Sequence, residues 1–166
     1  SVLMMSQDVF SMYLVEDVYN VQQTGFELLY DTINRDFDII GDGIVKVHET
    51  QTESRLRTYH VAVDFTLDYD GYVDLPGDPK LVAAVMPYTQ VISADLNKIY
   101  TVNIVNPTNP IVVNTYNTNI EFAGITGITG ELYALTKYRG LRVYDISTHS
   151  PSQIHWMYCL NNPVLG

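Results

Sequence analysis

The residues of this sequence most able to do chemistry are carboxylates, and they are densest in the range Asp64–Asp78. Three of them, Asp68, Asp70 and Asp74, lie within seven residues, and a glycine follows the second. Because Ca²⁺ takes about six to eight oxygen ligands around a tight turn, these three are candidate calcium ligands. The twelfth position counted from Asp68, where an EF-hand loop supplies a glutamate, is Pro79. The alternative is that these carboxylates form the solvated face of a hairpin.

Other metal-binding or nucleophilic patterns are weak. A second acidic segment, residues 36–43, has a similar composition. The four histidines have no ligand spacing, and a single histidine on a strand or turn is usually a hydrogen-bonded surface residue; they are His48, His60, His149 and His155. The single cysteine, Cys159, excludes an internal disulfide and any multi-cysteine metal site, and it is best explained as a small core residue. Calcium is therefore the one cofactor that the sequence suggests.

Enzyme motifs are lacking as well. There is no Gly-x-Ser-x-Gly sequence, and the glycine-rich segment 124–130 has neither the lysine nor the following helix of a phosphate loop. We expect that segment to be a loop between strands. Sugar hydrolysis needs a pair of carboxylates, but 19 acidic residues offer many such pairs, so their presence does not indicate a glycosidase. We therefore predict a non-enzyme, with a glycosidase as the enzyme class least at odds with the sequence.

Aromatic residues are the other candidates for a binding site. The chain has 13 tyrosines, and a tyrosine combines a large apolar area with a polar tip. We expect most of them to pack across strands. The four near predicted turns, Tyr69, Tyr72, Tyr138 and Trp156, are candidates for contacting a protein partner or a glycan.

The elements that must position these residues are short strands. The segments 102–105, 110–113, 131–135 and 141–146 mix β-branched and aromatic residues with polar ones at a period close to two. Pro-, Gly- and Asn-containing stretches separate the segments, and the Asp-Gly pairs at 42–43 and 70–71 predict hairpin turns. Segment 8–19 fits a helix or a strand about equally. The sequence thus predicts an all-β protein of some twelve to fourteen strands.

Composition limits the kind of partner. The chain has 166 residues, which suits a single domain, and a formal net charge of −10. Nine basic residues argue against general nucleic-acid binding, which needs many cations. No apolar run approaches the ~20 residues of a membrane span, so we expect no membrane insertion. The sequence starts at Ser1 without a signal-peptide pattern, so we expect a processed product or a piece of a longer protein.

An internal similarity connects two segments. Residues 100–113 recur at 141–151 with one residue deleted, and Asn103 matches Asp145 at a separation of 145 − 103 = 42. Such a side chain can accept hydrogen bonds from backbone N–H groups of the following turn. Weaker matches start at residues 72, 45 and 18.

The matching segments resemble the LVIVD-repeat family of β-propellers. The resemblance covers about residues 98–154 and rests on three segments: Gly140–Ser147, Asn106–Val113 and Glu131–Leu135. It implies one domain over 1–166, with divergent repeats in 1–97 and LVIVD-like repeats in 98–166. It also implies a propeller-like stack of small antiparallel sheets with about four blades, or a partial propeller completed by other chains. The family pattern is structural and carries no catalytic residue.

We therefore expect this protein to act by binding partners at its surface. We expect a non-catalytic extracellular or cell-surface protein that binds protein partners, including copies of itself or the remainder of a longer chain. A cytoplasmic location is the alternative, because removal of an initiator Met before Ser1 in the cytosol would give the same start. The alternative is a carbohydrate-binding module that uses the turn aromatics with Asp68, Asp70 and Asp74 and depends on calcium.

Overall fold

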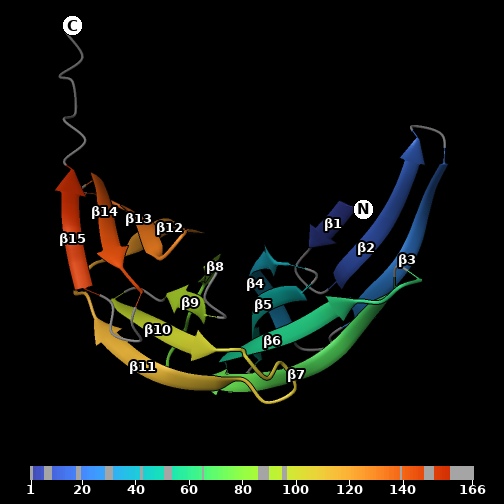
Figure 1. Ribbon diagram of the computed structural model, residues 1–166, viewed down its shortest axis with the longest axis horizontal. Helices are drawn as coiled ribbons and strands as arrows, with labels where there is room; N and C mark the ends of the chain where they lie inside the picture. Colours follow the sequence, from blue (N-terminus) through green and yellow to red (C-terminus); the bar gives the residue numbers. More distant parts are fainter. Residues whose placement is uncertain are drawn as a thin grey trace, which may run out of the picture.

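The chain forms strands and turns throughout the part that the structure describes. The computed structural model describes residues 2–5, 9–17, 20–28, 32–41, 43–50, 54–64, 66–85, 90–94, 97–138, 140–147 and 152–157 (Figure 1). These residues contain fifteen strands and no helix, slightly more strands than the sequence predicts. The prediction of an all-β protein is confirmed. Segment 8–19, which fitted either structure, contains a strand.

Four small antiparallel sheets, here named A to D, follow one another in chain order. Sheet A consists of β1 (Val2–Met5), β2 (Val9–Asp17) and β3 (Asn20–Leu28). Sheet B consists of β4 (Thr32–Ile40), β5 (Gly43–Thr50), β6 (Ser54–Val61) and β7 (Leu67–Leu75). Sheet C consists of β8 (Leu81–Val85), β9 (Gln90–Ala94), β10 (Lys98–Asn103) and β11 (Ile111–Asn117). Sheet D consists of β12 (Phe122–Ile128), β13 (Glu131–Thr136), β14 (Gly140–Asp145) and β15 (Ser152–Met157).

The sheets are arranged along an open arc (Figure 1). Each sheet is a meander in which every strand pairs with the next one along the chain. The first strands of sheets B, C and D lie together, because β8 packs against both β4 and β12. Sheet C is therefore enclosed between sheets B and D.

This enclosure explains the composition of sheet C. Strand β8 is a run of small and branched apolar residues, and the centre of β10 is buried on both faces. Val82 and Tyr100 face a core shared with sheet B, whereas Ala83 and Ile99 face a second core shared with sheet D. A strand covered on both sides loses the polar alternation of a half-exposed strand. Burial on both faces thus ties the middle sheet to its two neighbours.

Two aspartates of β4 bond directly to the free edge of β8. Asp36 Oδ2 accepts a hydrogen bond from Val82 N at 2.9 Å, and Asp38 Oδ2 accepts one from Ala84 N at 2.8 Å. Strand β8 pairs only with β9 within its sheet, so the N–H groups along its other edge need acceptors from elsewhere. The acidic segment 36–43, considered above for a metal, therefore supplies a contact between two sheets.

The matched positions Asn103 and Asp145 are equivalent in the fold. Each ends the third strand of its sheet. Asn103 Oδ1 accepts a hydrogen bond from Val105 N, and Asp145 Oδ1 accepts one from Ser147 N, both at 2.8 Å. The predicted capping of the following turn is thus confirmed. The weaker match at residue 72 is not equivalent, because it places Asp74 on the fourth strand of sheet B.

Two predictions about glycines are wrong. Asp70-Gly71 is not a turn but lies inside β7, where the register with β6 shifts between Thr58 and Tyr59 and leaves Asp70 as the extra residue. The glycine-rich segment 124–130 is strand β12 as far as residue 128, and only Thr129 and Gly130 form a turn, with φ of 35° and 82°. Two glycines within these strands, Gly71 and Gly127, lie where a neighbouring sheet approaches closely. Local pattern could not distinguish a glycine needed for close approach from a glycine needed for a turn.

Candidate functional site

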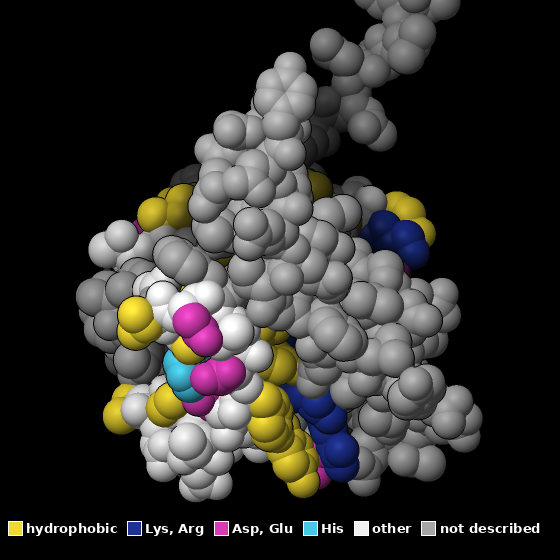
Figure 2. Space-filling view, turned by 90° about the vertical axis from the view of Figure 1, so that its right-hand side faces the viewer, with side chains coloured by type: hydrophobic (Ala, Val, Ile, Leu, Met, Phe, Trp, Pro, Cys, Tyr) yellow, Lys and Arg dark blue, Asp and Glu magenta, His cyan; other side chains and the backbone are white. Residues whose placement is uncertain are grey.

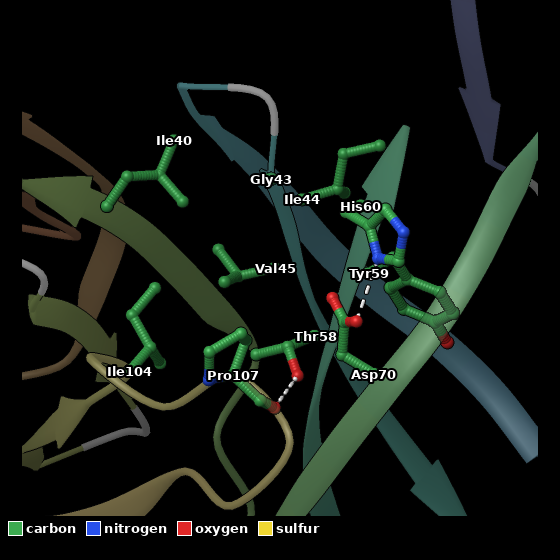
Figure 3. A pocket seen from close by; sticks show the side chains of 10 residues that line it. All are labelled: Ile40, Gly43, Ile44, Val45, Thr58, Tyr59, His60, Asp70, Ile104 and Pro107. Carbon is green, nitrogen blue, oxygen red and sulfur yellow. Dashed lines mark hydrogen bonds and ion pairs between the residues drawn. The ribbon is translucent and has the colours of Figure 1, made fainter. Parts of the chain in front are cut away.

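A pocket of about 190 Å³ lies between sheet B and the turn that follows β10 (Figure 3). Its walls are mainly apolar. Ile40 and Ile44 flank the β4–β5 turn, Val45 follows in β5, and Ile104 and Pro107 come from sheet C. The pocket therefore exists only because the two sheets stack.

Polar groups converge on one side of this pocket. The end of β6 carries His60, and the pairing of β6 with β7 places it opposite Asp68. His60 Nδ1 lies 2.8 Å from Asp70 Oδ1 (Figure 3). His60 Nε2 lies 3.7 Å from Asp68 Oδ2. Because a carboxylate oxygen accepts, the hydrogen bond to Asp70 requires the proton on Nδ1 and holds the imidazole ring in one orientation. Figure 2 shows acidic side chains gathered around a histidine on the face of the molecule seen there.

The Thr58 hydroxyl is a further polar group of the lining. It donates to the Pro107 carbonyl at 2.6 Å and also lies 3.1 Å from the Gly71 carbonyl. This hydroxyl is thus directed at the sheet C turn and not at His60. Together these groups form an apolar cavity with one oriented imidazole at its edge, an arrangement typical of binding sites.

The three predicted calcium ligands do not share one set of partners in the structure. Asp68 and Asp70 contact His60, as described above, whereas Asp74 Oδ1 lies 2.7 Å from Arg55 Nε. Among the described residues, no group of three His, Cys, Asp or Glu side chains could hold a metal ion. Calcium binding by Asp68, Asp70 and Asp74 stays a prediction.

Two of the predicted aromatic residues, Tyr69 and Tyr72, lie together on β7. Their exposed fractions are 49% and 46%. The Arg55 guanidinium lies 4.6 Å from the Tyr72 ring centroid, and Arg57 lies 5.4 Å from that of Tyr69. Cations at these distances from a ring attract it electrostatically. Figure 2 shows hydrophobic and basic side chains next to each other on this side of the molecule.

The other two aromatic candidates are on sheet D. Tyr138 follows β13 and is 80% exposed, and Trp156 lies in β15 opposite Arg142. The side chain of Trp156, like Cys159 and His149, lies outside the described residues. Tyr138 lines a second pocket, also of about 190 Å³. The four aromatics therefore belong to two separate regions.

Sequence reasoning did not identify the groups that surround His60 in the structure. It predicted a hydrogen-bonded surface histidine, and the imidazole is indeed half-exposed and bonded to Asp70. No pattern in the sequence indicated that a turn of sheet C would close a cavity beside His60. The alternating acids at 68 and 70 opposite a histidine were the one available clue, and using them requires the β6–β7 register.

Comparison with models of known protein families finds no match to this chain, and a search of curated proteins finds none. In the part of the chain that the structure describes, no helix is long and apolar enough to span a membrane.

Proposed function

We propose that this chain is a non-catalytic structural and interaction protein of the β-propeller type, which binds further protein by stacking sheets and associates with copies of itself. The common arrangement of sheets B, C and D supports this proposal. Each is a four-stranded meander, and their first strands lie together. An LVIVD-like architecture and a location outside the cell or at its surface are parts of the same proposal.

The observation that carries the proposal is the outward face of sheet D. The β13–β14 register places Leu135 opposite Leu141, and Tyr133 opposite Val143, on the face turned away from sheet C. Leu132 and Ala134, which alternate with these residues, are buried against sheet C. On the outward face Leu135 is 47% exposed, and Ile128, at the end of β12, is 56% exposed. Val143 on the same face is buried, at 6% exposure, so the exposed apolar side chains of this face are those of Leu135 and Ile128. Exposed apolar side chains that share one sheet face are typical of an interaction surface.

Sheet C supports this interpretation of the outward face. Ile99 and Thr101 occupy positions 42 residues before Leu141 and Val143 (141 − 99 = 143 − 101 = 42), and the 42-residue match of the two sheets makes these positions equivalent. Both Ile99 and Thr101 are fully buried, and Ile99 packs in the core shared with sheet D. A further sheet is the kind of protein surface that would cover the equivalent face of sheet D.

The native mass tests this proposal. Sedimentation velocity over a series of concentrations should show wild-type chain in reversible self-association. Leu135→Glu places a charge on the outward face and should shift the population to monomer, because burying an unpaired charge is costly. Ile111→Glu is the matched control, since Ile111 is 49% exposed but lies on β11 of sheet C. A wild-type chain that is monomeric at every concentration, or a Leu135→Glu variant that associates like wild type, would contradict self-assembly.

A further inference from the structure

The second pocket lies beside Tyr138 and differs in character from the first. It is formed by the segment that leads into β12 and by the turn after β13, and its lining residues are both polar and apolar: Asn119, Ile120, Glu121, Thr136 and Tyr138. Asn119 has a left-handed backbone with φ of 55°, a conformation that asparagine tolerates better than most residues. The amide of Asn119, the half-buried carboxylate of Glu121 and the exposed phenol of Tyr138 thus surround one depression.

Several hydrogen bonds hold the walls of this pocket in place. Lys137 N donates to the Glu121 carbonyl at 3.0 Å, and Lys137 Nζ lies 2.7 Å from Glu121 Oε1. The Thr136 hydroxyl donates to the Gly140 carbonyl at 2.8 Å. A site whose backbone is already bonded loses less conformational freedom when a ligand binds.

The charges of the pocket favour an uncharged ligand. The ammonium of Lys137 and the carboxylate of Glu121 compensate each other, and the Glu121 carboxylate, followed by Tyr138, raises the pKa of Lys137. A paired cation and anion leave little net field to select an ion. Carboxylate oxygens can still accept hydrogen bonds from hydroxyl groups, and an asparagine amide can both donate and accept.

The similarity between the sequences of sheets C and D does not account for the tyrosine at position 138. The position 42 residues earlier, 138 − 42 = 96, is Leu96. Tyr138 is also the most exposed of the three predicted binding tyrosines, with 80% of its surface open against 49% and 46% for Tyr69 and Tyr72. The Lys137 ammonium lies 5.4 Å from its ring centroid. An exposed, flat, amphipathic ring next to a polar depression suits a ligand that is apolar on one face and rich in hydroxyls at its edge.

We propose that this pocket binds a neutral pyranose sugar, which lays its C–H face on the Tyr138 ring and directs its hydroxyl groups to Glu121 and Asn119. The site is independent of metal, because its single carboxylate is bonded to Lys137. It is also separate from the outward face of sheet D, so sugar binding and self-association can be tested one without the other.

The test is a titration of the full chain with a panel of neutral mono- and disaccharides, followed by NMR shifts and repeated on a glycan array. At least one neutral sugar should bind wild type. Tyr138→Ala should weaken that binding roughly tenfold or more, which corresponds to about 1.4 kcal/mol. Tyr138→Phe keeps the ring and should bind within about threefold of wild type. Glu121→Ala should also weaken binding.

Val105→Ala is the control, because it shortens an exposed apolar side chain, 70% exposed and outside the pocket, and should leave sugar binding unchanged. Thermal unfolding of Tyr138→Ala should match that of wild type, since this side chain is largely exposed. The proposal is overturned if no neutral sugar binds, if Tyr138→Ala binds as well as wild type, or if Val105→Ala loses the same binding. Binding that disappears on chelation of calcium would also overturn it.

Discussion

Sheet C contacts its two neighbours by different physical means. Toward sheet B the contact includes directional polar bonds to backbone groups. Asp36 and Asp38 bind the edge of β8, Thr58 donates to the Pro107 carbonyl, and the Tyr100 hydroxyl donates to the carbonyl of Pro76. These bonds supplement an apolar core shared by the two sheets.

Toward sheet D the contact seen in the described residues is close apolar packing. Leu132 and Ile146 are fully buried in the shared core, and the Tyr116 and Tyr144 rings meet edge to face with centroids 6.2 Å apart. Gly127 of β12 lies so near β8 that an added Cβ would come within 2.4 Å of the Ala84 carbonyl oxygen. The fit on this side depends on the lack of a side chain.

The difference shows two ways of setting the position of one sheet on the next. A hydrogen bond to a particular N–H specifies register, because a shift by one residue would break it. Apolar packing is not directional, so its register depends on shape. A glycine marks a close approach on both sides, Gly127 toward sheet D and Gly71 toward sheet B, so the polar bonds are what distinguish the sheet B contact. The next three predictions test this contrast, beginning with the largest effect.

Replacing Gly127 with alanine should give the largest loss of stability. The new Cβ would meet Ala84 O at 2.4 Å and Val85 Cγ2 at 2.6 Å, so the sheets must move apart. We expect the free energy of unfolding to fall by about 1–3 kcal/mol, as for other overpacked sites. Gly124→Ala in the same strand is the control, because a Cβ added there would have no atom within 4 Å, and it should be neutral or slightly stabilising. Urea denaturation of both variants measures the difference, and equal stabilities would contradict the close approach.

Removing the carboxylate of Asp38 should have an intermediate effect. Both oxygens of this side chain accept, one from Ile39 N and one from Ala84 N, each at 2.8 Å. Asp38→Ala leaves the Ala84 N–H without this acceptor and should lower the free energy of unfolding by about 1–2 kcal/mol. Asp38→Asn retains one acceptor oxygen and should lose about half as much. If both variants unfold at the same urea concentration as wild type, the polar bonds between sheets B and C contribute nothing measurable.

The smallest expected effect is a pH dependence confined to the contact between sheets B and C. Burial raises the pKa of Asp36 above its usual value of 3.8, and the bonds from Val82 N and Phe37 N only partly oppose this. From 3.8 upward to the raised pKa, the folded chain therefore binds more protons at this residue than the unfolded chain does. The contribution of Asp36 to the free energy of unfolding must then fall as pH rises through that window.

Comparison with Asp36→Asn isolates this contribution. Asp64 and Asp145 have lowered pKa values, because hydrogen bonds from Thr66 and Ser147 favour their charged forms. Their stabilising contributions are lost as pH falls, but they are present in both proteins and cancel in the difference. The urea midpoint of wild type relative to Asp36→Asn should decrease as pH rises from 3.8. An increase would mean that the hydrogen bonds to Asp36 outweigh its burial.

Local sequence was sufficient for features that depend on near neighbours along the chain. The alternation in segments such as 131–135 and 141–146 predicted β13 and β14, because side chains on a strand alternate between faces. The capping by Asn103 and Asp145 was also predictable, since each bond spans only two residues. The exposed Tyr138 was selected from its place near a turn, although its pocket was not foreseen.

What the sequence by itself determined was a succession of short strands and turns with two matching segments 42 residues apart. Only the tertiary structure decided what Asp36, Asp38, Gly71 and Gly127 are for, because each of them acts on a strand or turn of another sheet. The cavity beside His60 was decided in the same way, since its walls come from two sheets. A contact between distant parts of the chain leaves no periodic pattern in either part, so the packing of sheet on sheet had to be seen in the fold.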